Sequence, residues 1–112
     1  MARFFNFPQS FVFMRMRYNG EFCELLGTLS KRDNFSIVVM LLEEGPLNIS
    51  EIYGKTELSK GALSRSLGRL GECGYVFSKK QGRERIFYLN KKTVVPLLKL
   101  LGRHAKRHLK NI

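Results

Sequence analysis

The sequence has few cysteines, few acidic residues and no long apolar run. Its two cysteines, Cys23 and Cys73, do not form a CxxC pair, which excludes a disulfide-rich scaffold and a zinc site built from cysteines alone. No apolar stretch approaches the roughly 18 residues that a membrane-spanning helix needs. The N-terminus lacks the continuous apolar core and the cleavage site of a signal peptide. We therefore expect a cytoplasmic protein that has no membrane partner.

Acidic residues are scarce in only one half of the chain. The protein has 20 Lys and Arg against 9 Asp and Glu, a net charge of +11. Residues 1–56 contain six basic and six acidic side chains and are neutral overall, so residues 57–112 carry the whole excess. A solubilising surface gives no reason for this segregation. A neutral half joined to a strongly basic half favours a polyanion, and above all nucleic acid, bound by one face.

Residues 1–20 are rich in phenylalanine, and the segment 11–18 (FVFMRMRY) fits neither a helical nor a strand period cleanly. So much aromatic surface has to be buried, either on the same domain or on a second subunit. From residue 21 onward the pattern is helical. The spacing i, i+3, i+4, i+7 predicts one buried face that consists of Phe22, Leu25, Leu26 and Leu29.

A second helix is predicted over residues 34–44. Asp33 is the expected N-cap, and Gly45-Pro46 ends the helix. Its segment 37–42 is apolar all round. A helix without a polar face belongs at the centre of a small core.

Two short helices with start signals of their own follow. Asn48 and Glu51 have the spacing of a capping box, and Leu47 and Ile52 stand at the staple positions around it, which predicts a helix over 49–55. Ser59 is the expected cap of the next helix, over 60–72, which closes at Gly74. Two short helices separated by a tight turn form a helix-turn-helix.

The predicted helix 60–72 has two unlike faces. At about 100° per residue, its leucines cluster on one side, and these are Leu63, Leu67 and Leu70. The opposite side is small or cationic, with Lys60 and Arg69 at its margins; it carries Gly61, Ser64, Arg65 and Gly68. A helix in a major groove needs such a face, because side chains must reach base edges while the backbone comes close. A solvated helix face can have the same pattern, but the basic half of the chain favours DNA.

A β-hairpin is predicted next. Its strands are residues 75–78 and 85–89, and Gly82 lies near the tip. The tip region is cationic, with Lys79, Lys80, Arg83 and Arg85. Such an arm is typical of phosphate or minor-groove contacts. The alternative is that these cations only discourage edge pairing.

The chain ends in a predicted helix from residue 93, with Thr93 as cap and Pro96 in the first turn. An apolar stripe runs along it through Leu97, Leu98, Leu101, Ala105, Leu109 and Ile112. Because the domain ahead already has its core helices, this stripe favours a partner helix, most simply its copy in a homodimer. The expected dimer contacts are Phe11, Phe13, Leu97, Leu101 and Leu109.

The expected fold class is α+β, mainly α with a small β-hairpin: a winged helix-turn-helix with flanking dimerisation segments. We expect one domain over 1–112, with an aromatic-rich segment 1–20, a core 21–92 and a C-terminal amphipathic helix 93–112. The segment LSKGALSRSLGRLGECGYV, from Leu58 to Val76, resembles the recognition helix and first wing strand of prokaryotic ArsR- and MarR-type repressors. The segment from Leu25 to Ile52 is similar to their entry helices.

The resemblance implies a DNA-binding role for two groups of residues. Ser59, Lys60, Gly61, Ser64 and Arg65 stand at groove-facing positions of such families, and Lys80 and Arg83 stand at wing positions. Together with the cations at the margins of the helix face, the expected recognition-helix contacts are Ser59, Lys60, Gly61, Ser64, Arg65 and Arg69. Together with the other cations of the hairpin tip, the expected wing contacts are Lys79, Lys80, Arg83 and Arg85. Terminal helices usually build the dimer in these families. Their metal sensors carry a cysteine pair in the helix before the recognition helix, whereas residues 49–55 hold no Cys, His or Asp.

The leading hypothesis is a homodimer that binds specific double-stranded DNA and regulates transcription as a repressor. The alternative is a winged helix that binds RNA or another protein within a larger machine. An enzyme is disfavoured, because His104 and His108 have the HxxxH spacing of zinc proteases without the Glu that acts as base. We expect no cofactor and no metal. Redox control through Cys23 or Cys73 is a further hypothesis, although cysteines are commonly just small core residues.

Overall fold

The computed structural model describes the backbone of residues 9–109 and the side chains of residues 20–109. Five helices and a three-stranded antiparallel sheet make up the described part. Their order is α1 (Gln9–Ser30), α2 (Arg32–Glu44), β1 (Leu47–Asn48), α3 (Ile49–Lys55), α4 (Lys60–Glu72), β2 (Val76–Gln81), β3 (Glu84–Leu89) and α5 (Lys91–His108). The predicted α+β class and winged helix-turn-helix are confirmed. No helix in this range is long and apolar enough to cross a membrane.

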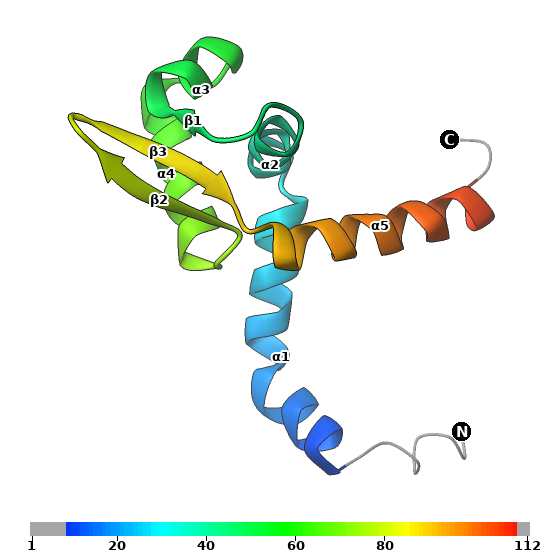
Figure 1. Cartoon of the computed structure of the whole chain (residues 1–112). Helices are drawn as coiled ribbons and strands as arrows, with labels where there is room; N and C mark the ends of the chain where they lie inside the picture. The colour runs from blue at the N-terminus through cyan, green and yellow to red at the C-terminus, as the bar shows by residue number, and fades with distance from the viewer. Residues whose placement is uncertain (1–8, 110–112) are drawn as a thin grey trace.

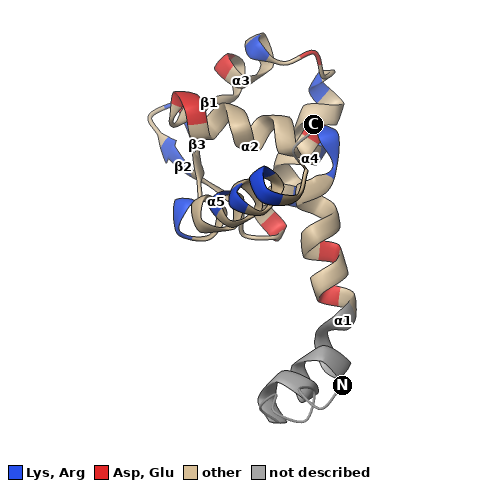
Figure 2. Cartoon of the chain, turned by 90° about the vertical axis from the view of Figure 1, so that its right-hand side faces the viewer, with Lys and Arg blue, Asp and Glu red and all other residues tan. Residues whose placement is uncertain are grey.

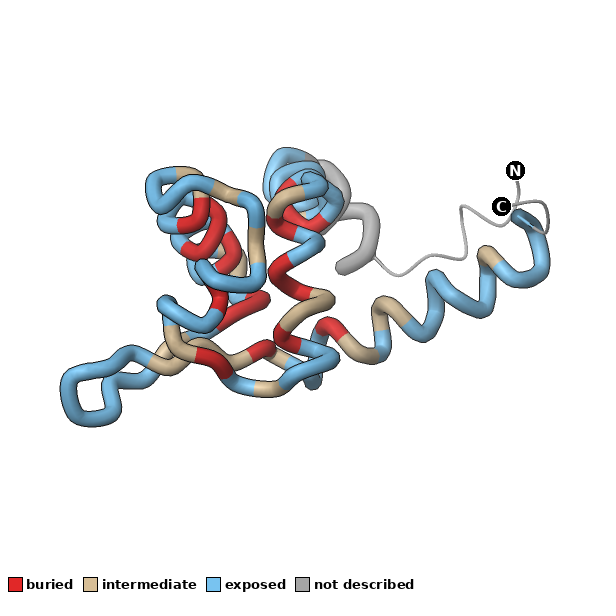
Figure 3. The backbone as a smooth tube through the Cα atoms, turned by 90° about the horizontal axis from the view of Figure 1, so that it is seen from above, coloured by how far each residue is buried: buried red, intermediate tan, exposed pale blue. Residues whose placement is uncertain are grey.

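Three parts of the molecule project from a central group of helices. The β2–β3 hairpin points away on one side and α5 on the other, while the N-terminal half of α1 extends below (Figure 1). The radius of gyration is 17.1 Å, compared with about 13 Å for a compact domain of this length. Figure 3 shows that α5 is exposed along most of its length beyond the core. The shape is that of a small core with arms.

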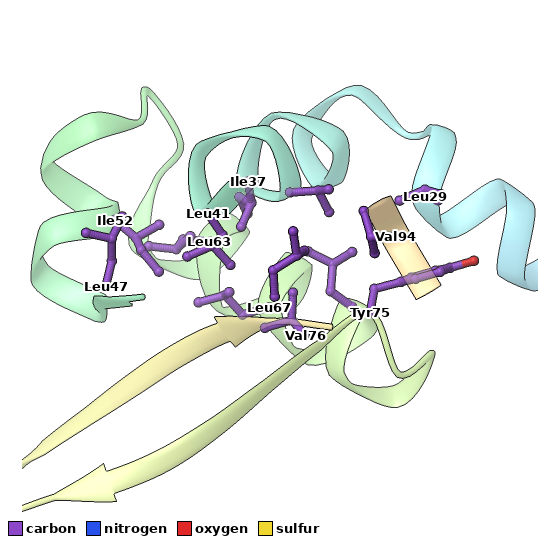
Figure 4. Close-up of a cluster of buried hydrophobic side chains, with 13 residues drawn as sticks. Leu29, Ile37, Leu41, Leu47, Ile52, Leu63, Leu67, Tyr75, Val76 and Val94 are labelled. Atoms are coloured by element: carbon purple, nitrogen blue, oxygen red, sulfur yellow. The ribbon is translucent and has the colours of Figure 1, made fainter. Parts of the chain in front are cut away.

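The core lies where α4 packs on α2 and on the base of the hairpin. It contains 13 buried hydrophobic side chains among the described residues. Every helix and strand contributes at least one of them, and Tyr75 comes from the turn before β2. Ile37 and Leu41 of α2 face Leu63 of α4 (Figure 4). Val76 lies beside Leu67 in the same view. Burial of each such side chain contributes about 1.5–3 kcal/mol.

Local capping fixes the two helices of the helix-turn-helix as the sequence predicts. At the start of α3, the backbone N–H of Glu51 donates to Asn48 Oδ1 over 2.8 Å, and the N–H of Asn48 donates to Glu51 Oε1 over 2.9 Å. The capping box is therefore complete. At the start of α4, Ser59 Oγ accepts from the N–H of Ala62 over 3.1 Å. Both predicted caps and the bounds of both helices are confirmed.

The junction between α4 and the sheet is held by Tyr75 and Asn90. Gly74 adopts φ +78°, where a side chain would be strained, and its carbonyl accepts from Asn90 Nδ2 over 2.9 Å. The hydroxyl of Tyr75 donates to the carbonyl of Leu25 over 2.8 Å. Burial raises the pKa of this phenol, so it stays a neutral donor. These bonds join α1, the end of α4 and the start of α5.

Several predicted boundaries are wrong. The N-cap of α2 is Lys31 and not Asp33, which lies within the first turn, where a negative charge suits the helix dipole. Helix α5 begins at Lys91, with Asn90 and not Thr93 as N-cap, since the backbone N–H groups of Thr93 and Val94 donate to the carbonyl of Asn90. Pro96 therefore lies in the second turn of α5 and not in the first.

The sheet and α1 are larger than predicted. Segment 11–18, left open between helix and strand, is part of α1. Strands β2 and β3 pair from Val76↔Leu89 to Gln81↔Glu84, so only Gly82 and Arg83 form the turn. The sequence did not predict β1, which pairs with β3 through Leu47↔Phe87 and Asn48↔Ile86.

Replacement of Asn48 by Ala should lower the free energy of unfolding by about 1–2 kcal/mol. The change removes the half of the capping box that the Asn48 side chain makes, and also the bond from Asn48 Nδ2 to Glu84 Oε1, which is 3.0 Å long. Urea denaturation followed by circular dichroism measures the loss. Ser50→Ala is the control, because Ser50 is exposed in the same helical turn. Equal losses in the two variants would show that the capping box does not stabilise the fold.

Candidate nucleic-acid interface

The two faces of α4 differ as the spacing of its residues predicts. Leu63, Leu67 and Leu70 are buried, whereas the opposite side is exposed along its length, at Gly61, Ser64, Arg65 and Gly68. The guanidinium of Arg65 reaches back along the helix, since a Cβ built at Gly61 would lie 3.4 Å from Arg65 Nη1. This surface, which we call the reading face, presents small groups, a hydroxyl and one guanidinium without a carboxylate partner among the described residues.

Beside the reading face, Lys60 lies over the ring of Tyr53, with Nζ 5.6 Å from the ring centroid. Tyr53 is 40% exposed on α3, and a cation so placed is attracted to the face of the ring. Tyr53 is not among the contacts predicted from the sequence. The signal was present, because Ile52 is the buried residue of this short helix and its neighbour must point outward. Tyr53 thus sets where Lys60, at the first position of α4, presents its charge.

The hairpin, or wing, ends in the two-residue turn Gly82-Arg83. Gly82 has φ +64° and Arg83 does not have a positive φ, which is the pattern of a type II′ hairpin turn. Beyond the core, Lys80 and Arg85 are directly opposite each other in the register. Like charges in this position are destabilising. An anion close to both would relieve the repulsion.

The four predicted wing cations are not equivalent. Lys79 lies over two aromatic rings, 6.0 Å from the centroid of Phe77 and 5.6 Å from that of Tyr88. Arg85 Nη1 donates to Ser78 Oγ over 3.0 Å. The side chains of Lys80 and Arg83 are exposed and have no ion pair or hydrogen bond within the described range. They are the wing cations that are most available to a ligand.

Arg69 differs from the other predicted recognition-helix residues. Its guanidinium donates to Glu24 Oε1 over 2.9 Å, to Glu72 Oε1 over 2.8 Å and to Thr28 Oγ1 over 3.2 Å. The hydrogen bonds to Glu24 and then Glu72 raise the pKa of Arg69. The side chain therefore ties α4 to α1 in the free protein. Sequence spacing could not show this, because Glu24 lies 45 residues away.

Charge and apolar surface are distributed differently on the arms. Figure 2 shows acidic residues on the described part of α1 and basic residues along α5. Of the predicted dimer contacts, Leu97 packs against the core, whereas Leu101 and Leu109 are 54% and 50% exposed. Phe11 and Phe13 lie outside the residues whose side chains are described. An apolar groove of about 500 Å³ runs between α1, α2 and α5, and Leu26, Leu29, Phe35, Leu97, Leu98 and Leu101 line it.

The remaining candidate groups do not assemble into a reactive site in the described part of the chain. Cys23 is exposed and Cys73 half-buried, and neither forms a disulfide. The rings of His104 and His108 stack with their centroids 4.4 Å apart. No group of three or more His, Cys, Asp or Glu side chains suited to a metal occurs in this range.

Residues 36–78 match the model of the family described as "Bacterial regulatory protein, arsR family". The match runs from within α2 to β2 and contains the whole helix-turn-helix. Of the two families that the sequence resembles, the match is to the ArsR type. None of the curated proteins compared with the chain matches it.

Solved structures of other proteins are similar to this chain, and three of them are compared with it as follows. HlyU from Vibrio cholerae N16961 is 28% identical, with a TM-score of 0.65, over 78% of this chain and 94% of that one. HlyU from Vibrio vulnificus CMCP6, described as a transcriptional regulator, is 26% identical with a TM-score of 0.63, over 80% and 92%. The transcriptional repressor BigR from Xylella fastidiosa is 26% identical with a TM-score of 0.64, over 77% and 87%.

Proposed function

We propose, on the premise that residues 36–78 form an ArsR-type helix-turn-helix, that the chain is a homodimeric repressor that binds a specific double-stranded DNA sequence. The observation that carries the proposal is the reading face of α4. The leucines of this helix are buried, and Gly61, Ser64, Arg65 and Gly68 are exposed within the matched segment. The description of BigR as a repressor and the excess of basic residues in 57–112 support it further.

In the proposed complex, α4 enters the major groove and reads bases. Gly61 and Gly68 let the helix backbone approach the base edges, and Ser64 offers a hydroxyl. Arg65 supplies the one guanidinium of the reading face, and a guanidinium can bridge O6 and N7 of guanine. Ser59 and Lys60, at the start of the helix, contact phosphates or the first base pair. Arg69 does not take part, because it joins α4 to α1.

The wing contacts the DNA backbone beside the groove. A phosphate near Lys80 and Arg85 would remove the repulsion between these opposed cations. Arg83, in the turn, reaches a further phosphate or the narrow minor groove. Lys79 is held over Phe77 and Tyr88 and contributes to the local potential.

The arms build the dimer. Residues 1–112 form one winged-helix domain with its core at 21–92, and the segments 1–20 and 93–112 reach the second copy. The exposed leucines of the arms and the groove between α1, α2 and α5 give each copy apolar surface that its own core does not cover. A twofold dimer of this kind requires half-sites about 10–10.5 bp apart, or a multiple of that distance.

Replacement of Arg65 and of Arg83 by Ala should impair binding in different ways. Selection of duplexes from a random pool first supplies the cognate site. Arg65→Ala should then weaken cognate binding by about 1–3 kcal/mol while affinity for random duplex changes little. Arg83→Ala should weaken both by similar factors, unless the minor groove is its target, in which case the loss depends on A·T content beside the half-site. An unchanged cognate preference in Arg65→Ala would exclude α4 as the reading helix and, with it, the proposed function.

The affinity for DNA should depend strongly on salt. If each subunit neutralises about 4 phosphates, the logarithm of the binding constant falls with the logarithm of salt concentration with a slope near −7 for the dimer. Loss of Arg83 reduces the slope by about one per subunit. A fluorescence titration over a salt series measures this value. A slope shallower than about −3 would mean that the basic half is mostly solvated surface.

Sedimentation should give a dimer at micromolar concentration. Leu101→Asp places a charge in the apolar groove and should shift the equilibrium toward the monomer by at least tenfold, because the charge would lose its water in the interface. Leu42→Asp is the matched control, since this leucine is 37% exposed on α2 and does not line the groove. A monomer in the wild type, or equal effects of the two substitutions, would contradict the proposed interface.

A further inference from the structure

The C-terminal segment carries more of the protein's excess charge than the proposed DNA interface does. Residues 90–112 hold seven basic side chains and no acidic one, so they account for seven of the eleven excess positive charges. The segment 57–89, which contains the reading face and the wing, holds seven basic and three acidic side chains and supplies the other four. The reading and wing contacts therefore leave the larger share of the charge unused.

The described cations of α5 gather on one side of the helix. Five of them are exposed and fall within about 100° of one another on the helical wheel; this basic face consists of Lys92, Lys99, Arg103, Lys106 and Arg107. The opposite side packs on the core, because Val94 is fully buried and Leu97 and Leu98 lie against the buried cluster. The basic face is therefore directed away from the core.

The basic face has no counter-charge within the described part of the protein. None of its five members forms an ion pair there, and the last acidic residue of the sequence is Glu84, which precedes α5. Arg103 has Lys99 four residues before it and Arg107 four residues after it, and like charges at this spacing destabilise a helix. A face that only kept the protein soluble would mix acidic with basic residues. The pattern favours a ligand that supplies many negative charges in a row.

The basic face lies on a different arm of the molecule from the proposed DNA contacts. Figures 1 and 3 both show α3, α4 and the wing on one side of α2, and α5 extends away from the other side. A duplex bound by α4 and the wing therefore leaves the basic face of α5 uncovered. Any polyanion that neutralises this face is a second one.

Two kinds of polyanion suit a basic amphipathic helix. At a membrane, the helix inserts its apolar side among the lipids, but in α5 that side lies against the core and the groove lined by Leu101. The phosphate backbone of a nucleic acid needs only the cations. From Lys92 to Arg107 the basic face spans about 22 Å, at about 1.5 Å per residue, which matches about six base pairs of a duplex at about 3.4 Å each.

We infer that the basic face of α5 binds the phosphate backbone of a second segment of duplex DNA, whatever its sequence. Each copy of the chain then holds one duplex at α4 and the wing and another at α5, so the protein bridges two segments of DNA. The contact at α4 rests on the proposed function, whereas the contact at α5 does not.

The first test asks whether one protein holds two duplexes. The full chain is bound to bead-linked cognate duplex, and a short fluorescent duplex of random sequence is then added. We expect the beads to retain the second duplex with a dissociation constant of about 1–100 μM, the range of binding to DNA without sequence preference. Absence of retention would overturn the inference.

Variants assign the retained duplex to α5. Arg103→Gln combined with Lys106→Gln should weaken retention at least tenfold, because each lost phosphate contact costs close to tenfold at about 0.1 M salt. Affinity for the bead-linked cognate duplex should change less than about twofold, since neither residue lies on the reading face or the wing. Lys31→Gln combined with Arg32→Gln is the matched control, because it removes one Lys and one Arg from exposed positions at the start of α2. Equal losses in the two double variants would show that retention follows net charge, and the inference would be wrong.

Other ligands are offered in place of the random duplex. Duplex RNA, or vesicles of phosphatidylserine and phosphatidylcholine, should bind the basic face more weakly than DNA does; tighter binding of either would overturn the assignment to DNA.

The failure of the proposed function can be told apart from the failure of this inference. If selection yields no cognate duplex, the proposed function fails, and random duplex alone is titrated against the α5 double variant and against the wing variant that combines Lys80→Gln with Arg83→Gln. A loss of at least tenfold in the α5 variant supports the site on α5. A loss confined to the wing variant would overturn it.

Discussion

The leucine face of α4 packs into a core to which every other element contributes, and the rest of the molecule is arranged around that contact. Burial of Leu63, Leu67 and Leu70 fixes the rotation of the helix about its own axis. Because that rotation is fixed, Ser64, Arg65 and Gly68 face outward together. Packing in the core, and not any contact at the surface, therefore determines that Arg65 and Ser64 face outward. A core substitution that turns α4 changes the reading face without touching it.

The sequence predicted best what depends on neighbouring residues. Asn48 and Glu51 stand three apart, and their capping box could be read directly, as could the cap at Ser59 and the glycine of the wing turn. The faces of α4 followed from helical spacing alone. The predictions failed where a distant residue decides. Asn90, the N-cap of α5, bonds to Gly74 in the turn before β2, and Arg69 is paired with Glu24 on another helix. Strand β1 has two residues, too few for any alternation to appear.

On α4, the residues proposed to bind DNA are separate from those that hold the helix in place. Arg69 and Arg65 lie four residues apart on the same helix, yet Arg69 is held by two carboxylates and Arg65 has no ion pair within the described residues. A guanidinium satisfied inside the protein has little to gain from a phosphate. Lys80 and Arg85 lie opposite each other on the wing, where like charges repel, and an anion close to both would relieve that repulsion. In the proposed complex, a DNA phosphate would restore the stability that this pair of cations costs the free protein.

The short strand β1 limits how the chain can associate with itself. In the order β1-β3-β2, β1 covers one edge of the sheet over only two residues, and the other edge, β2, carries Lys79 and Lys80. Edge lysines discourage the addition of a strand from another molecule, and so does an edge that is short or twisted. Many copies crowded along one duplex would therefore not join sheet to sheet. The proposed dimer accordingly uses apolar surface of the helices and not the edges of the sheet.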